Sequence, residues 1–142
     1  MKEPTKNVTR KRVIILCSAL ALCALIVGAV ILFSYLDSVS RYQEQVRTTV
    51  ISDVDVSSIP DGSYIGEYDV QFIYAKVDVR VHSGKITEVI ILEHRNDRGM
   101  TAESIVDSIV TAQTLDVDAV SGATNSSTVL RKAVELALLS AG

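Results

Sequence analysis

The chain has 142 residues but only two cysteines, two prolines, few aromatic residues and no tryptophan. Both cysteines, Cys17 and Cys23, fall inside one long apolar run near the N-terminus. The remainder of the chain can therefore form neither a disulfide nor a thiolate metal site. Paired carboxylates, a Ser/His/Asp set and an HExxH motif are also missing from the sequence. We therefore predict no catalytic residue and no permanent metal site.

Positive charge is scarce after the apolar run. From residue 37 onward, nine Lys and Arg stand against 16 Asp and Glu, which gives a formal net charge of −7. Binding to nucleic acid needs a basic surface. This composition excludes nucleic acid as a partner.

The apolar run itself covers residues 13–36 and contains no charged side chain. About 20 apolar residues cross a bilayer as a helix, so we predict one transmembrane helix here. Positive charge on the cytoplasmic side sets the orientation of such helices. We expect residues 1–12 to be cytoplasmic and the C-terminal domain to lie outside the cell membrane. The basic residues of this N-terminal segment are Lys2, Lys6, Arg10, Lys11 and Arg12.

The apolar run has three other interpretations. One is a core helix of a soluble protein, which is improbable because the run has no polar face. A cleaved signal peptide has a shorter apolar core, followed by a small-x-small cleavage site. A lipoprotein signal needs a small residue before its cysteine, whereas Leu22 precedes Cys23 and the apolar run continues beyond it. The membrane anchor is the interpretation that we favour.

Residues 37–59 are expected to be a stalk or linker. Apolar positions at Val39, Tyr42 and Val46 favour a helix that continues to about Thr49. The turn-forming residues 57–62 then mark the start of a compact domain, which we place at residues 60–142.

A β-hairpin is the clearest pattern in this domain. After a first short strand over residues 63–68, apolar and polar residues alternate from Ile73 to His82. Ser83-Gly84 fits a two-residue turn, and residues 86–92 form the return strand. This turn fixes the register of the hairpin, so we expect Val81 to face Ile86, Val77 to face Ile90, Ala75 to face Leu92 and Glu88 to face Val79.

Two helices are expected after the strands. Thr101 is placed to cap a helix that runs to about Gln113, with Ile105, Val106, Ile109 and Val110 facing inward. A second helix is expected from roughly Thr128 to Leu139, and its apolar face consists of Leu130, Ala133, Val134, Ala137 and Leu138. The fold class is therefore α+β: a transmembrane helix, then a small antiparallel sheet with two C-terminal helices packed on it.

A run of small and hydroxyl-bearing residues, Asp118-Ala119-Val120-Ser121-Gly122-Ala123-Thr124, lies just before the last helix. The first N–H groups of a helix have no partner within the helix, and its dipole is positive at that end. Glycine lets another group approach the backbone closely. The physics favours an anion here, above all a phosphate.

This stretch resembles the D-x-x-S-G-A-T flavinylation motif of the FMN-binding domain family. That family includes the flavin-bearing subunits of sodium-pumping NADH:quinone reductase and of the Rnf complex. The resemblance implies that a flavin transferase joins the phosphate of FMN to Thr124. It also implies a signature formed by Asp118, Ser121, Gly122 and Ala123, with Asp118 aiding recognition or transient metal binding.

The same resemblance predicts a role in electron transfer with a membrane or extracytoplasmic redox partner, rather than stand-alone catalysis. It also suggests that His94, at the end of the hairpin, faces the flavin ring. A surface histidine is the alternative at that position. The absence of Lys and Arg from Gly99 to Leu130 favours a singly charged phosphodiester over free FMN. The alternative is that Arg95, Arg98 or Arg131 folds back to supply a cation.

Two alternatives to flavinylation stay open from the sequence. Locally, residues 121–127 are also typical of a helix start that Ser or Thr caps. For the whole protein, the alternative is a flavin-free binding or scaffolding module of the same fold, tethered to the membrane.

Overall fold

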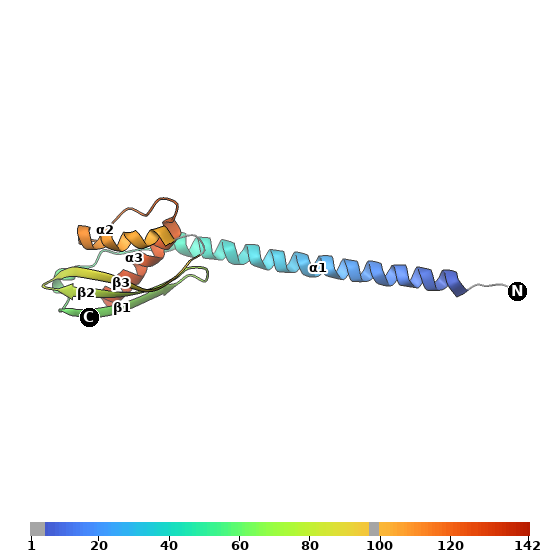
Figure 1. Ribbon diagram of the computed structural model, residues 1–142, viewed down its shortest axis with the longest axis horizontal. Coiled ribbons are helices and arrows are strands. Elements are labelled where there is room, and N and C mark those ends of the chain that lie inside the picture. The colour runs from blue at the N-terminus through green and yellow to red at the C-terminus, as the bar shows by residue number, and fades with distance from the viewer. Residues whose placement is uncertain (1–4, 97–99) are drawn as a thin grey trace. The chain divides into compact units, whose positions relative to one another are not determined.

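The computed structural model describes residues 5–96 and 100–142, and the chain divides into two compact units, residues 1–40 and 41–142. Two short 3-10 turns, η1 and η2, accompany three helices and three strands (Figure 1). In chain order the elements are α1 (Thr5–Thr48), η1 (Val56–Ser58), β1 (Gly62–Asp69), β2 (Tyr74–His82), β3 (Lys85–Arg95), η2 (Met100–Ser104), α2 (Ile105–Ala112) and α3 (Thr124–Leu139).

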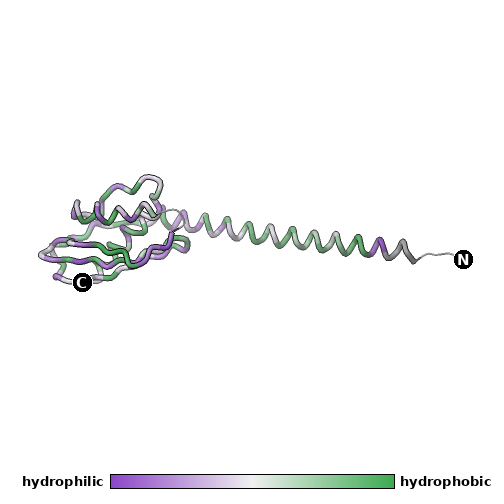
Figure 2. The backbone as a smooth tube through the Cα atoms, viewed as in Figure 1, coloured by the Kyte–Doolittle hydropathy of each residue, from purple (hydrophilic) through white to green (hydrophobic). Residues whose placement is uncertain are grey.

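The first unit consists of most of α1. The large apolar side chains from Val13 to Leu36 are all more than half exposed, and Figure 2 shows this apolar stretch in green. By length and composition, α1 qualifies as a helix that can cross a membrane.

The second unit begins at Arg41, inside the last turns of α1. We expected residues 37–59 to be a stalk or linker and the compact domain to start at Pro60. Within the second unit, however, Val46, Val56 and Ile59 belong to the hydrophobic core. This stretch therefore contributes apolar side chains to the fold.

The sheet is antiparallel with the strand order β1-β2-β3. The alternating apolar residues of β2 and the residue before it are at most 5% exposed, as the sequence predicts. Ser83 and Gly84 have φ angles of 52° and 70°, the positive values that a type I′ hairpin turn requires. The buried residues of this face are Ile73, Ala75, Val77, Val79 and Val81.

The predicted pairing of β2 with β3 is correct only next to the turn. Val81 pairs with Ile86, but the register shifts between Val81 and Arg80 and again between Val77 and Lys76. Ala75 therefore pairs with His94 instead of Leu92. A β-bulge places one extra residue in one strand and moves the pairs beyond it by one. The first bulge pairs Glu88 with Arg80, to which it forms a 2.6 Å ion pair.

The two C-terminal helices pack on this sheet: α3 contacts β1 and β2, and α2 contacts β3. The predicted inward residues of α3 are at most 1% exposed, and Ile105 and Ile109 of α2 are fully buried. The α+β architecture predicted from the sequence is thus confirmed.

Both helices begin at residues other than the expected ones. Thr101 does not cap α2; it lies in η2, where its carbonyl accepts a hydrogen bond from the Ser104 hydroxyl, and the α-helix starts at Ile105. Fully buried Ala102 draws this turn into the core. α3 begins at Thr124 rather than near Thr128, because the Ser127 N–H already bonds to the Ala123 carbonyl.

Candidate functional site

The loop before α3 ends in a tight turn. The Ala123 N–H bonds to the Val120 carbonyl at 3.0 Å, and Gly122 has a φ of 78°, which glycine adopts without strain. The fully buried Ser127 hydroxyl accepts a 3.0 Å hydrogen bond from the Val120 N–H. These bonds fix the position of Thr124 as the first residue of α3.

The N-terminus of α3 has no side-chain cap. Its N-cap residue is Ala123, which has no hydroxyl or carboxylate to offer. Within residues 5–96 and 100–142, the backbone N–H groups of Thr124, Asn125 and Ser126 donate no hydrogen bond. The interpretation of this segment as a Ser- or Thr-capped helix start is therefore wrong, and the positive end of the helix is available to an anion.

The side chain of Thr124 is accessible as well. The residue is exposed, and its hydroxyl has no hydrogen-bond partner in the described part of the chain. Only its carbonyl is engaged, by the Thr128 hydroxyl at 3.1 Å.

A pocket of about 640 Å³ lies beside Thr124, within the range of small-molecule sites. Thr124, Thr128 and Arg131 line it from α3, at the i, i+4 and i+7 spacing that puts them on one helix face. The other lining residues are Asn125 of α3 and, from the end of α1 and the segment after it, Gln43, Val46, Arg47, Thr49 and Ile51.

The start of α3 is held against the last turns of α1. The Asn125 amide donates a 2.7 Å hydrogen bond to the Tyr42 hydroxyl. The Tyr42 ring packs edge-to-face on Phe72, with centroids 5.3 Å apart. Because Phe72 lies in the connection between β1 and β2, these contacts tie three parts of the domain together beside the pocket.

The predicted signature residues are not all in one place. Ser121 and Gly122 are exposed in the turn, and Ala123 is buried beneath it. Asp118 is exposed and lines a different pocket of about 600 Å³, together with Asp107 and Asp116. No group of three or more His, Cys, Asp or Glu in the described ranges could hold a metal ion.

His94 is buried rather than on the surface. Its side chain is 2% exposed, and its Nδ1 lies 3.0 Å from a carboxylate oxygen of Glu103 in η2. Its Nε2 is buried without a hydrogen-bond partner in the residues described. An unsatisfied buried nitrogen is rare and is normally explained by water or a bound group. His94 does not line the Thr124 pocket.

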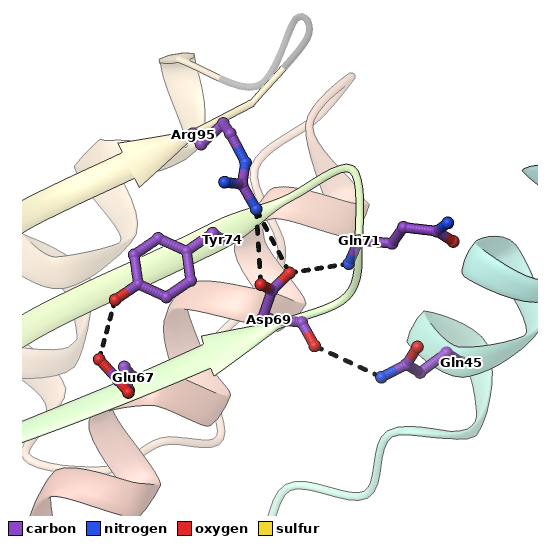
Figure 3. A network of polar contacts seen from close by, with 6 residues as sticks. All are labelled: Gln45, Glu67, Asp69, Gln71, Tyr74 and Arg95. Atoms are coloured by element: carbon purple, nitrogen blue, oxygen red, sulfur yellow. Dashed lines mark hydrogen bonds and ion pairs between the residues drawn. The ribbon is translucent and has the colours of Figure 1, made fainter.

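The end of the sheet near β1 and β2 carries a polar network centred on Asp69 (Figure 3). The Asp69 carboxylate lies 3.4 Å from Arg95 and accepts the Gln71 N–H, while its carbonyl accepts the Gln45 amide. Arg95 also lies 5.5 Å from the centroid of the Tyr74 ring.

Tyr74 is engaged in the same network. Its phenol donates a 2.8 Å hydrogen bond to Glu67. That hydrogen bond raises the pKa of Tyr74 above its usual 10.0, with smaller effects from desolvation and neighbouring carboxylates. The Tyr74 side chain is therefore engaged by neighbouring residues on the surface of the sheet.

The cationic lining of the pocket was only partly anticipated from the sequence. The stretch from Gly99 to Leu130 lacks Lys and Arg, but Arg131, which the sequence left as an alternative, and Arg47, which it did not indicate, line the pocket beside Thr124. The missing cations therefore do not support a phosphodiester. The i+7 spacing of Arg131 from Thr124 places both residues on one face of the helix.

Residues 71–139 match the family model described as FMN-binding domain. Comparisons with curated proteins and with solved structures gave no match. The matched range contains β2, β3, α2 and α3 together with the whole motif before Thr124. An uncapped helix start, an unpartnered hydroxyl and a pocket with two arginines fit a phosphate-bearing cofactor. Residues 71–139 of this chain therefore match the FMN-binding domain family, and this match supports FMN as the cofactor of the domain.

Proposed function

We propose that this protein is a membrane-anchored electron-transfer flavoprotein whose FMN is joined through its phosphate to Thr124. The observation that carries the proposal is the Thr124 hydroxyl, exposed and without a partner among the described residues, at the uncapped start of α3. The family match over residues 71–139 supplies the identity of the ligand.

Attachment requires a nucleophilic oxygen that is unhindered and held in line. The Thr124 oxygen forms a bond to phosphorus and gives up its proton to a base of the transferase, while a phosphoanhydride bond of an activated flavin nucleotide breaks and a nucleoside monophosphate leaves. We assign this step to a separate flavin transferase, as the resemblance to the FMN-binding domain family implies. Small neighbours at Gly122 and Ala123 leave the hydroxyl accessible to that enzyme.

The residues that hold the bound group are those of the pocket and the helix start. The free N–H groups at the start of α3 suit the phosphate, while Val46 and Ile51 offer apolar surface. Ser121, Gly122 and Ala123 shape the turn, and Asp118 serves recognition by the transferase. FMN supplies the one- or two-electron chemistry, and the protein tethers and orients the FMN.

His94 is assigned to the flavin ring in this proposal. The Nε2 of His94 has no hydrogen-bond partner among the described residues. On the other side of the imidazole, Glu103 holds Nδ1 in place.

Residues 13–36 form the transmembrane segment in this proposal. With residues 1–12 in the cytoplasm, the flavin domain lies outside the cell membrane and works as a tethered carrier. A tether raises the effective concentration of the flavin at its partners, which suits an electron relay between a membrane donor and an extracytoplasmic acceptor.

The test is the intact mass of the full chain, purified after co-expression with a flavin transferase. The wild-type chain is expected to carry FMN and to stay yellow after denaturation. Thr124→Ala is expected to lose the adduct completely, and Thr124→Ser to keep it, because a hydroxyl is all that the bond requires.

Thr128→Ala is the matched control. Thr128 has the same side chain, on the same face of α3 and in the same pocket, but its hydroxyl bonds to the Thr124 carbonyl. It should leave the adduct intact. An adduct that persists in Thr124→Ala contradicts the attachment site. A wild-type chain that never gains flavin favours the alternative, a flavin-free tethered binding module of the same fold.

A further inference from the structure

The pocket beside Thr124 is cationic although the chain around it is acidic. Its nine lining residues include two arginines, Arg47 and Arg131, and no Asp or Glu. After residue 36, by contrast, 16 acidic residues stand against nine basic ones. Two guanidinium groups in one pocket therefore select for an anion rather than reflect the general charge of the surface.

Arg131 is held in place and still has donors to spare. Its side chain is only 18% exposed, and its Nε donates a 2.7 Å hydrogen bond to the Leu115 carbonyl. Its Nη2 lies 3.9 Å from the Asp116 carboxylate, whose side chain is 95% exposed. A guanidinium has five N–H donors. In the described ranges the donors on the Nη atoms form no hydrogen bond, so they are free for a ligand.

Arg47 approaches the same pocket from the end of α1. Its side chain is 78% exposed, and among residues 5–96 and 100–142 its one ion-pair partner is Glu44, one turn earlier, at 2.9 Å. An exposed helical pair of this kind stabilises the helix little. Arg47 can therefore exchange Glu44 for a more strongly charged anion in the pocket at small cost.

We propose that Arg131, assisted by Arg47, binds the phosphate of FMN in this pocket. Arginine is suited to this because its planar fork pairs with two phosphate oxygens at once. Neither arginine belongs to the motif of residues 118–124, and Arg47 also lies outside the range that matches the FMN-binding domain. The inference rests on the proposed placement of FMN at Thr124.

The test uses the full chain with Thr124→Ala, in detergent, so that binding is reversible and independent of covalent attachment. FMN and riboflavin, which differ by the phosphate alone, are titrated while flavin fluorescence is measured. FMN should bind at least about tenfold more tightly than riboflavin, the ratio expected for charge-assisted hydrogen bonds. Adding Arg131→Gln should remove most of this preference and leave riboflavin binding unchanged, and Arg47→Gln should reduce it less.

Arg80→Gln is the matched control, since it removes the same charge from an exposed ion pair on the sheet. It should leave the preference for FMN intact. An FMN preference that survives Arg131→Gln, or a Thr124→Ala chain that does not prefer FMN to riboflavin, overturns the inference. Failure of covalent attachment is a separate result, because it is read from the mass of the wild-type chain.

Discussion

At Gly66 the backbone of β1 lies against the backbone of α3. A Cβ on this residue would overlap the Ala133 carbonyl and the backbone of Ala137. Because backbone atoms cannot move aside as a side chain can, Gly66→Ala should push α3 off the sheet. We expect it to destabilise the domain by about 1–3 kcal/mol, the usual effect of overpacking. Urea unfolding of the full chain in detergent measures this as a lower midpoint.

Gly62→Ala is the control for this prediction. Gly62 lies in the same strand, but the atoms nearest to its Cβ would belong to the Tyr64 side chain, the first at 3.2 Å, and not to the backbone. That substitution should change the midpoint little. Equal effects at the two positions would show that loss of backbone freedom, and not the contact with α3, determines the result. The pairing of β1 with β2 is regular at Gly66, so this glycine serves the close approach of α3 and not a bulge.

At the scale of elements, β3 is the part that the sequence predicted least well. Strict alternation specified the buried face of β2, and all of its predicted residues are buried. In β3 the four residues 89–92 are all apolar, so alternation could not reveal which of them face inward. Two bulges determine which residues of β3 face inward, and they place His94 opposite Ala75 on the buried face. A pattern with period two does not contain that information.

The free edge of β3 is covered by one side chain from the end of α2. The Gln113 amide donates to the Ile86 carbonyl at 2.7 Å, and its oxygen accepts the Ile86 N–H at 2.9 Å. Gln113→Ala should leave both groups of Ile86 unpaired and destabilise the domain by about 1–3 kcal/mol. Hydrogen exchange at the Ile86 amide should accelerate with it.

Thr111→Ala serves as the comparison for Gln113. Thr111 is an exposed residue of the same helix, and its replacement should change neither the stability nor the exchange rate at Ile86. If Gln113→Ala left the Ile86 amide as protected as before, the strand edge would have to be covered by other groups.

At the scale of the whole molecule, the sequence singled out Thr124, the attachment point that we propose, but not the pocket beside it. Thr124 could be singled out because the motif is continuous in sequence. Arg47, Tyr42 and Asn125 were missed because the pocket joins the end of α1 to α3, elements more than 70 residues apart. Residues 41–48 continue the pattern of a helix, and nothing in a helical pattern indicates what its far end will contact.

The second unit should therefore fold from Arg41 and not from Pro60. A fragment of residues 41–142 keeps Val46 and Val56 in the core, and full burial of such a side chain contributes about 1.5–3 kcal/mol. A fragment of residues 60–142 loses both, together with the Tyr42 partner of Asn125. The longer fragment should unfold cooperatively in urea, whereas the shorter one should be several kcal/mol less stable, enough to unfold a marginal domain. Equal unfolding midpoints for the two fragments would mean that residues 41–59 are a linker after all, and that the part of α1 that lines the pocket beside Thr124 is dispensable for the fold.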